Sequence, residues 1–463
     1  MSGRDQWAFV GLALLARLIP IGLTLELGIG LDDMLQYDDL AQSLLAGHGY
    51  TWYGGIPTAF RAPLYPLFLA AIYGVFGHHF VAARVVQASL GAILCLITYR
   101  LALHLYDDRR VARVAGLLVA LYTLLLIYPV ALVTENLFLP LTAAALLLTL
   151  EADRRGDRWR WVAAGFLWAA AILTRSVVAA FLPLVLLWVW WGRALPREKV
   201  LITALLIVST LVTTLPWAIR NSLLLGQPVY VESSLGFQLY LGYHPGSEGT
   251  FDAGVAADIL GTVQAQERRN LAVEVDLNRT GVQKTLEFIA QDPGRLPLLT
   301  LSKASHFFRL DTRGLLYFYT NDFVGPLPAW LILLVGAALA GPTFLVLLGA
   351  PWGLMASLGR RETLLLNGFI LYFIAIHAAI LSEPRFNLPL IPVLAAYAAY
   401  GYSRLPAFWT SLRSSGELAR PATFAAIVLS LLLIANWGYQ FWVEAERWAI
   451  VLSPGGNSAH FSY

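Results

Sequence analysis

The chain has 463 residues, of which 58% are hydrophobic and 13% carry a charge. Soluble domains carry about 25% charged residues, so this composition indicates an all-α, polytopic membrane protein. The formal net charge of +3 is too small to favour nucleic acid as a partner. The single cysteine, Cys95, excludes an intramolecular disulfide and a cysteine-based metal site.

Eleven apolar stretches predict transmembrane helices. They cover residues 7–29, 83–105, 112–128, 131–150, 161–174, 176–191, 200–218, 327–350, 363–381, 386–402 and 421–437. The first stretch has no small-residue cleavage pattern, which favours a retained span over a removed signal peptide. Lys and Arg collect at every second junction, so those loops and the N-terminus are placed in the cytoplasm.

This alternation leaves two long segments outside, residues 30–82 and 219–326. Within the first, Leu64–Gly77 has 14 residues, fewer than the ~20 that a spanning helix needs. We interpret it as a re-entrant or interfacial helix; the alternative is a short true span, which would invert the later loops. The predicted organisation is an N-terminal transmembrane module, an external loop subdomain, C-terminal transmembrane helices and an external tail, over residues 1–218, 219–326, 327–437 and 438–463.

The first external loop opens with a predicted amphipathic helix, Leu31–Leu45. Its apolar residues recur at helical spacing opposite a polar side that includes Asp33 and Gln36, and this polar side should face water. Asp33 is a candidate general base or ligand of a divalent cation. The alternative is an acid at a helix N-terminus that the dipole stabilises, with Asp32 as the cap.

Four arginines fall on the predicted external side. They are Arg61, Arg175, Arg220 and Arg385. Positive charge should favour the cytoplasmic side, so their shared sidedness indicates an anion held at the external face. Arg61 precedes Ala-Pro-Leu-Tyr-Pro. A guanidinium at the lipid–water boundary can bind a lipid-borne phosphate through two hydrogen bonds. Each arginine taken alone also fits a side chain that extends to the lipid headgroups.

A second acid, Glu135, lies at an external span boundary with apolar residues on both sides. Such a carboxylate must face a polar cavity or a partner, and pairing with an arginine of a neighbouring span is the structural alternative. Asp33, Glu135 and Asp32 are candidate ligands for a shared divalent ion, Mg²⁺ or Mn²⁺. Because arginines already supply positive charge for a phosphate, we favour metal-independent chemistry.

The segment Gly236–Phe251 is rich in glycine and aromatic residues and contains His244. Aromatic rings with polar side chains suit a sugar, although glycine-rich turns occur in many external loops. Tyr37 and Tyr65 of the first external loop, together with His244, are the expected substrate contacts.

These residues together resemble the C-type (GT-C) superfamily of polyprenyl-phosphate-sugar-dependent glycosyltransferases, in the branch of protein O-mannosyltransferases and aminoarabinose transferases. The matching motifs run in family order: Asp33-(x3)-Tyr37-(x3)-Ala41, Gly47-His-Gly-Tyr50, Arg61-Ala-Pro-Leu-Tyr-Pro, Thr134-Glu135, Leu173-Thr-Arg175, Trp217-Ala-Ile-Arg220-Asn221 and Arg385-Phe-Asn-Leu-Pro389. The resemblance implies a GT-C-type bundle of about eleven transmembrane helices, with external juxtamembrane helices and one larger external loop.

The resemblance also implies roles for single residues. Asp33 matches the essential acid of the first external loop, although Met34 stands where much of the family has Glu and Asp32 precedes instead. Glu135 matches the second external acid. Arg61 and Arg385 match basic residues at the donor phosphate, with Arg175 and Arg220 as further candidates for its rim.

We therefore expect a multi-pass glycosyltransferase of the plasma (inner) membrane, with its active site on the external or periplasmic face. It would move a sugar from a polyprenyl monophosphate to a protein, lipid or glycan acceptor, with inversion and with Asp33 as the base. The alternative is a transporter or flippase for a lipid-linked or anionic substrate. A non-catalytic lipid-binding scaffold is a further alternative.

Overall fold

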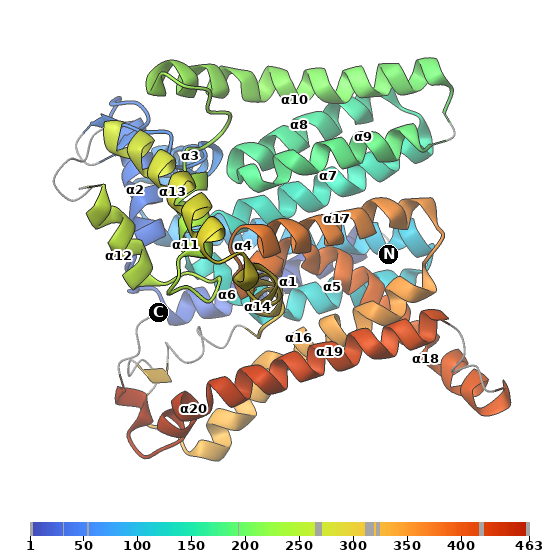
Figure 1. Ribbon diagram of the computed structural model, residues 1–463. Coiled ribbons are helices and arrows are strands. Elements are labelled where there is room, and N and C mark those ends of the chain that lie inside the picture. The colour runs from blue at the N-terminus through green and yellow to red at the C-terminus, as the bar shows by residue number, and fades with distance from the viewer. Residues whose placement is uncertain are drawn as a thin grey trace.

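The structure is a computed structural model that describes residues 3–30, 32–52, 55–192, 194–263, 271–310, 319–320, 325–415 and 421–459. Most of its helices run side by side as one bundle (Figure 1). The bundle helices are α1 (Gly3–Leu23), α4 (Phe80–Tyr106), α5 (Arg109–Leu121), α6 (Thr123–Ile127), α7 (Glu135–Arg155), α8 (Arg158–Thr174), α9 (Leu182–Trp190), α10 (Pro196–Leu225), α16 (Ala329–Ala356), α17 (Arg361–Ala379), α18 (Ile391–Ser415) and α19 (Pro421–Val443).

Seven helices in the described part of the chain are long and apolar enough to cross a membrane. They are α1, α4, α7, α10, α16, α17 and α19. An eighth candidate is the pair of α5 with α6 and the short 3₁₀ turn η1 (Tyr128–Val130), which bends by 62°. The expected count of eleven is therefore not confirmed. Several expected spans are shorter or broken: α8 has 17 residues, and α9 has 9 residues after the 3₁₀ segment η2 (Ser176–Phe181).

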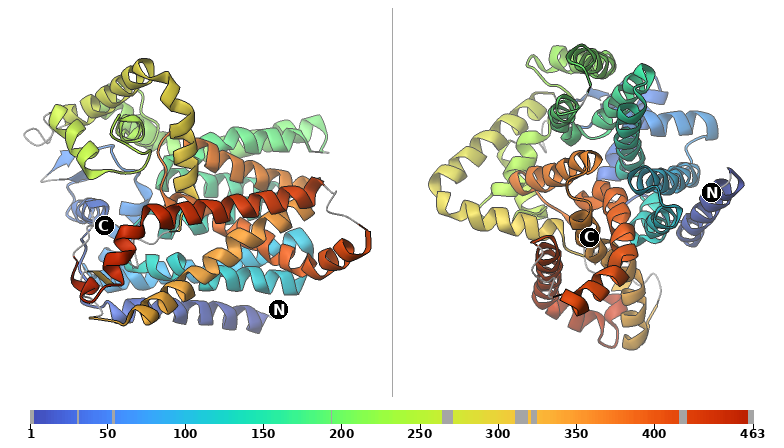
Figure 2. Two further views of the ribbon diagram at one scale, coloured as in Figure 1. Left: turned by 60° about the horizontal axis from the view of Figure 1, so that its bottom comes forward. Right: turned by 90° about the vertical axis from the view of Figure 1, so that its right-hand side faces the viewer.

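A second group of elements gathers at one end of this bundle, which we call the cap end (Figures 1 and 2). It comprises α2 (Asp32–Leu45), the two-residue strands β1 (Thr51–Trp52) and β2 (Ile56–Pro57), α3 (Leu64–Phe76), α11 (Leu235–Tyr243), α12 (Ala253–Thr262), α13 (Leu271–Gln291) and α14 (Leu296–Phe307). The strands pair antiparallel, with Thr51 opposite Pro57. Helix α3 has 13 residues, fewer than the ~20 of a spanning helix, and lies at the cap end.

Small residues allow the bundle helices to approach closely. At the crossing of α16 and α18, a side chain at Gly353 would collide with the backbone of Tyr397, and one at Gly401 with the backbone of Gly349. Helices that pack in lipid use such small residues because close backbone contact replaces the hydrophobic driving force. The crossing fixes where α18 begins, and the short segment before α18 carries Arg385.

Helix α2 has the expected amphipathic form, with Tyr37, Leu40 and Ala41 buried. Its polar side does not face open water as expected. Asp33 and Gln36 both contact Arg61, which returns from the β1–β2 hairpin to lie against the helix. The polar side of α2 therefore faces an arginine of the protein.

A buried arginine of α4 holds the connection between α1 and α2. The Arg84 guanidinium donates to the carbonyl oxygens of Val130 (2.8 Å), Thr24 (3.1 Å), Leu27 (2.7 Å) and Gly28 (3.1 Å). Because buried carbonyls need donors, this one side chain stabilises the turn that follows α1 and the bend in η1. The position of α2 at the cap end depends on that turn.

Candidate functional site

The first ion pair of the site joins Asp33 of α2 to Arg61. Asp33 Oδ1 accepts from Arg61 Nη2, and Arg61 Nε donates to Gln36 Oε1 at 2.8 Å. The guanidinium carbon also lies 5.4 Å from the ring centre of Tyr37. The side chains of Arg61 and Asp33 remain 17% and 30% exposed, so water or a ligand can reach the pair.

Arg385 approaches the same carboxylate from the opposite end of the sequence. It lies in η4 (Pro384–Leu390), a 3₁₀ segment with a proline at each end of its PRFNLP run, directly before α18. Arg385 Nη1 lies 3.8 Å from Asp33 Oδ2, and its Nε lies 3.2 Å from Glu383 Oε2. Asp33 thus lies between two guanidinium groups, and the structure brings Arg61 and Arg385 together as expected.

A second ion pair, Arg175 with Glu135, lies beside the first. Arg175 Nη1 donates to Glu135 Oε1 at 2.6 Å and to Thr134 Oγ1 at 3.2 Å. The Arg175 guanidinium also lies 5.4 Å from the ring centre of Phe386, the neighbour of Arg385. Glu135 is 4% exposed, so it faces the protein and not lipid. It makes the pairing with a neighbouring arginine that the sequence left open.

The charges in this cluster hold one another in their ionised forms. Burial raises the pKa of the Asp33 carboxyl, but the positive charges of Arg61 and Arg385 outweigh it, so the net pKa lies below its usual range. Burial, which outweighs the nearby charge of Arg61, raises the pKa of Tyr37 to about 12. For Arg61, burial lowers the pKa, and the charge of Asp33 reverses this to a net increase. The site therefore holds three cations, Arg61, Arg175 and Arg385, together with three carboxylates, of which Asp33 is partly exposed and the other two are buried.

Tyr65 does not line this site. Its side chain is fully buried beneath α2, its ring lies edge-on against Tyr37 at 5.1 Å, and its hydroxyl donates to Gln87 Oε1 at 2.6 Å. The expectation of a direct substrate contact is corrected: Tyr65 packs under Tyr37 because its ring belongs to the apolar core between α2 and α3.

Arg220 also lies apart from the charge cluster. It donates to the carbonyl oxygens of Thr58 and Tyr50, the latter at 3.2 Å, and its guanidinium lies 4.7 Å from the ring centre of Trp217. These contacts hold the loop that carries Arg61. We therefore remove Arg220 from the candidate phosphate ligands and assign it a structural contact with the loop backbone.

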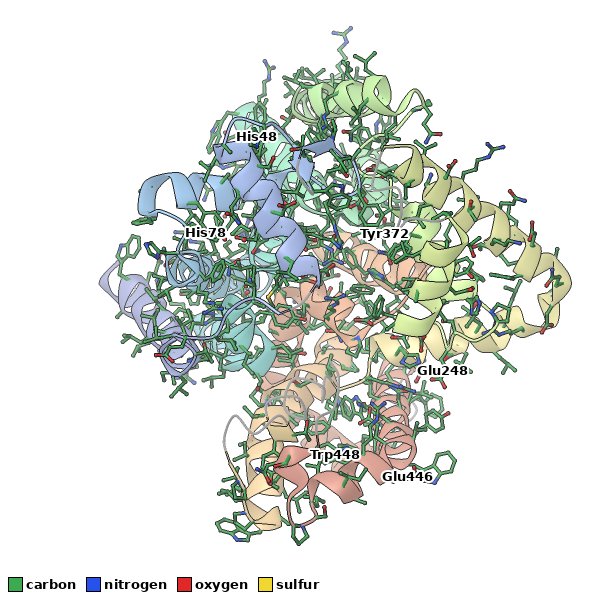
Figure 3. The ribbon with its side chains drawn as sticks, turned by 90° about the vertical axis from the view of Figure 1, so that its left-hand side faces the viewer. His48, His78, Glu248, Tyr372, Glu446 and Trp448 are labelled. Atoms are coloured by element: carbon green, nitrogen blue, oxygen red, sulfur yellow. The ribbon has the colours of Figure 1, made fainter. Side chains whose placement is uncertain are left out.

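His244 belongs to the cap elements around α11. Its Nε2 lies 3.5 Å from Asp258 Oδ2, and its Nδ1 accepts from the backbone of Gly246 at 3.1 Å. Its ring packs on Tyr240 and Phe288. Figure 3 looks onto the cap end, with α2 and α3 on one side and α11 to α13 on the other. The ring of His244 contacts Tyr240, Asp258 and Phe288 of the second group.

The described residues contain no group of three or more His, Cys, Asp or Glu side chains placed to hold a metal ion. The side chain of Asp32 lies outside the described part of the chain. Of the other candidate ligands, Asp33 binds arginine and so does Glu135. Both carboxylates are thus engaged with cationic side chains.

Three acidic or amide residues near the site were not expected as site residues. Gln36 accepts from Arg61, Glu383 pairs with Arg385, and Glu232 accepts a hydrogen bond from the Ser176 hydroxyl next to Arg175. Glu232 also contributes to the raised pKa of Arg61. The closeness of Glu383 to Arg385 in the sequence was a usable signal, whereas Glu232 had none.

Comparison with known proteins agrees with this architecture. A family model described as dolichyl-phosphate-mannose-protein mannosyltransferase matches residues 60–218, which include Arg61, Glu135 and Arg175. An undecaprenyl phosphate-alpha-4-amino-4-deoxy-L-arabinose arabinosyl transferase of Pseudomonas aeruginosa is 27% identical over 229 residues. That match covers 47% of this chain and only 41% of the relative.

Two solved structures share the fold over almost the whole chain. ArnT from Cupriavidus metallidurans, bound to undecaprenyl phosphate, matches with a TM-score of 0.54 and 16% identity, over 99% of this chain and 75% of that one. The apo oligosaccharyltransferase of Archaeoglobus fulgidus matches with a TM-score of 0.51 and 15% identity, over 100% of this chain and 62% of that one. With its apolar helices, these likenesses identify a multi-pass membrane protein. The chain therefore shares the fold of these two structures, and its residues 60–218 are similar to the mannosyltransferase family model.

Proposed function

We propose that this protein is a membrane glycosyltransferase that moves a sugar from a polyprenyl monophosphate to an acceptor. One observation carries the proposal: Arg61 and Arg385, far apart in the sequence, converge on one partly exposed carboxylate. Two guanidinium groups at a low-dielectric boundary suit a lipid-borne phosphate, which accepts charge-assisted hydrogen bonds from both. The arabinosyl transferase named above carries undecaprenyl phosphate in its name, and the ArnT structure was solved with undecaprenyl phosphate bound.

In this proposal the donor phosphate competes with Asp33 for the two arginines. The lipid tail stays in the bilayer, and the phosphate takes over the hydrogen bond that Arg61 gives to Asp33 and replaces Asp33 in the ion pair with Arg385. Arg175 lies next to Arg385 through Phe386 and would contribute to the rim of the phosphate site. Glu135 would act by holding Arg175 in place through their 2.6 Å contact.

The same exchange would prepare Asp33 as the general base. The arginines now hold the pKa of Asp33 low, and a low pKa makes a weak proton acceptor. When the phosphate neutralises both arginines, the pKa of Asp33 rises towards its ordinary value, and the carboxylate can accept the proton of an acceptor hydroxyl. The hydroxyl oxygen then attacks the anomeric carbon, the bond to phosphate breaks, and direct displacement inverts that carbon. The arginines stabilise the charge on the departing phosphate.

The sidedness of the site follows from the distribution of arginine. The connection between α7 and α8 carries Arg154, Arg155 and Arg158, and a full helix separates it from Glu135 and Arg175 in the site. Positively charged connections mark the cytoplasmic side. We therefore propose that the cap end faces outward, towards the periplasm or the exterior, in a bacterial or archaeal plasma membrane.

The experiment is a transfer assay on the full chain reconstituted in vesicles with a labelled polyprenyl-phosphate sugar and an acceptor extract. A transferase releases polyprenyl phosphate and labels the acceptor. Movement of intact labelled lipid across the bilayer without cleavage would identify a flippase and overturn the proposal. If the protein binds polyprenyl phosphate but no acceptor extract gives a labelled product, the protein is a lipid-binding scaffold and the proposal is wrong.

A further inference from the structure

We propose that Glu274 of α13 is a positioning residue for Arg61, and that it couples the cap helices α11 and α13 to the donor phosphate site. This inference rests on the proposed function, because it assigns Arg61 to the phosphate. Glu274 lies in a helix of the larger external loop. Its described contacts are hydrogen bonds, and none of them is an ion pair with a charged residue of the site.

Glu274 is a buried carboxylate, 7% exposed, whose two oxygens accept hydrogen bonds from the segment before Arg61. Thr58 Oγ1 donates to Oε2 at 2.8 Å, and the backbone N–H of Ala59 donates to Oε1 at 3.0 Å. The Ser233 hydroxyl donates to Oε1 as well. Burying a carboxylate is unfavourable unless it is hydrogen-bonded, and here three separate groups satisfy it.

These contacts lie two to three residues from Arg61. The Thr58 hydroxyl also accepts from the backbone of Phe60 at 3.0 Å, so the bond to Glu274 fixes a local turn. On the other side of Arg61, the Tyr50 hydroxyl donates to the carbonyl oxygen of Arg61 at 3.0 Å. The backbone of Arg61 is thus held from two directions, by the first external loop itself and by α13.

Helix α13 is in turn fixed to α11 by close backbone contact. A side chain at Gly236 of α11 would collide with the Asn278 carbonyl, and one at Gly281 of α13 with the Gly236 carbonyl. The amide of Asn278 also accepts from the Gly236 backbone at 2.8 Å. Movement of α11 is therefore transmitted to α13 and to Glu274.

The far end of α11 contacts the segment that carries Arg385. A side chain at Gly242 would collide with the Ile380 carbonyl, and the Ser382 backbone donates to the Gly249 carbonyl at 3.0 Å. The pair α11–α13 thus spans from the Arg61 segment to the Arg385 segment. The distance between Arg61 and Arg385 therefore depends on the position of α11 and α13. An acceptor that binds to these two helices would change that distance.

The Glu274 carboxylate accepts from all three partners; the Ala59 N–H can only donate, whereas the Ser233 and Thr58 hydroxyls can donate or accept. Burial raises the pKa of Glu274 above its usual range, while the hydrogen bonds from Ser233 and Thr58 oppose that rise. Glutamine has the same shape, but its amide nitrogen cannot accept, so the Thr58 hydroxyl that now donates to Oε2 would have to reverse its hydrogen bond. Glu274→Gln is therefore the smallest change that disturbs the hydrogen bonds between Glu274 and the segment before Arg61.

The test measures the affinity of the full chain for undecaprenyl phosphate in nanodiscs. We expect Glu274→Gln to weaken binding about tenfold, as the loss of roughly one buried hydrogen bond would do. Glu287→Gln, a change at a half-exposed position of the same helix, is the matched control and should stay within about twofold. Thr58→Ser should keep wild-type affinity, whereas Thr58→Val should lose part of it; if Glu274→Gln fails to fold, this pair decides the question.

The double variant separates the inference from the proposed function. If Glu274 acts through Arg61, then Glu274→Gln adds no further loss of affinity to Arg61→Ala. Fully multiplicative losses, or a lower melting temperature with unchanged affinity, would overturn the positioning role and leave the phosphate site intact. Wild-type affinity in Arg61→Ala would instead overturn the phosphate site itself.

Discussion

Two groups of arginines lie near the cap end, and they differ in the acceptors that their guanidinium groups contact. Arg61, Arg175 and Arg385 pair with carboxylates, and their side chains are 17%, 25% and 24% exposed. Arg84 and Arg220 bind backbone carbonyl oxygens, and Arg84 is 1% exposed. A carboxylate can be exchanged for another anion without unfolding the chain, whereas a carbonyl in a buried turn cannot. The first group is therefore suited to ligand binding and the second to structure.

The largest effect should follow from removal of the carboxylate that the paired arginines share. Asp33→Asn removes a negative charge and the proposed base while keeping the shape of the side chain. We expect transfer to fall at least about 100-fold, the lower end of what a general base contributes. Binding of undecaprenyl phosphate should be retained or strengthened, because the competing anion is gone. Near-normal turnover in this variant would show that Asp33 is not the base.

The next effect concerns the two arginines that share Asp33. Arg61→Ala and Arg385→Ala should each weaken binding of undecaprenyl phosphate about 10- to 100-fold, since each loses charge-assisted hydrogen bonds to phosphate. Titration of the purified variants measures this. Because both arginines act on one anion, their double variant should lose less than the product of the single losses. Independent, fully multiplicative losses would place the two arginines at different ligands.

A smaller effect on binding, but a clear one on stability, is expected from the carbonyl-bound group. Arg84→Ala removes a donor from four backbone carbonyl oxygens, of which that of Val130 is buried, and should lower the free energy of unfolding by about 1–3 kcal/mol. Thermal unfolding in detergent measures this loss. Affinity for undecaprenyl phosphate should change by less than about threefold at a temperature where the variant is folded. A loss of affinity as large as that of Arg61→Ala would erase the distinction between the two groups.

The smallest effect is expected from metal removal. Asp33 and Glu135 are each engaged by an arginine, so positive charge for the phosphate is already supplied by side chains. We therefore expect that a chelator changes the transfer rate by less than about twofold. Activity that disappears with the chelator and returns with Mg²⁺ or Mn²⁺ would contradict this and restore the carboxylates as candidate metal ligands.

Much of the fold and the charge cluster was predictable from the sequence, for physical reasons. Charge at a membrane boundary is unfavourable without a partner, so Asp33, Glu135 and the arginines stood out in an apolar chain. Hydropathy also marked the long helices. The count of spans was less predictable, because α8 is short and the pair α5–α6 bends by 62°, and neither feature has a clear signal in hydropathy.

The partners of individual side chains were the least predictable part. Arg220 matched a motif, yet it binds backbone carbonyls, which carry no sequence signature. Tyr65 follows Arg61 by four residues but points into the core because α3 packs beneath α2. Glu274 lies in an ordinary amphipathic helix, and its partner Thr58 is 216 residues away in the sequence. Only tertiary structure reveals contacts of this kind.

The most direct test of the central claim is an experimental structure of the full chain with bound polyprenyl phosphate. The account predicts that the phosphate oxygens lie within hydrogen-bonding distance of both Arg61 and Arg385, with the carboxylate of Asp33 released from at least one of them. A phosphate bound elsewhere, with the Arg61–Asp33–Arg385 contacts unchanged, would contradict it.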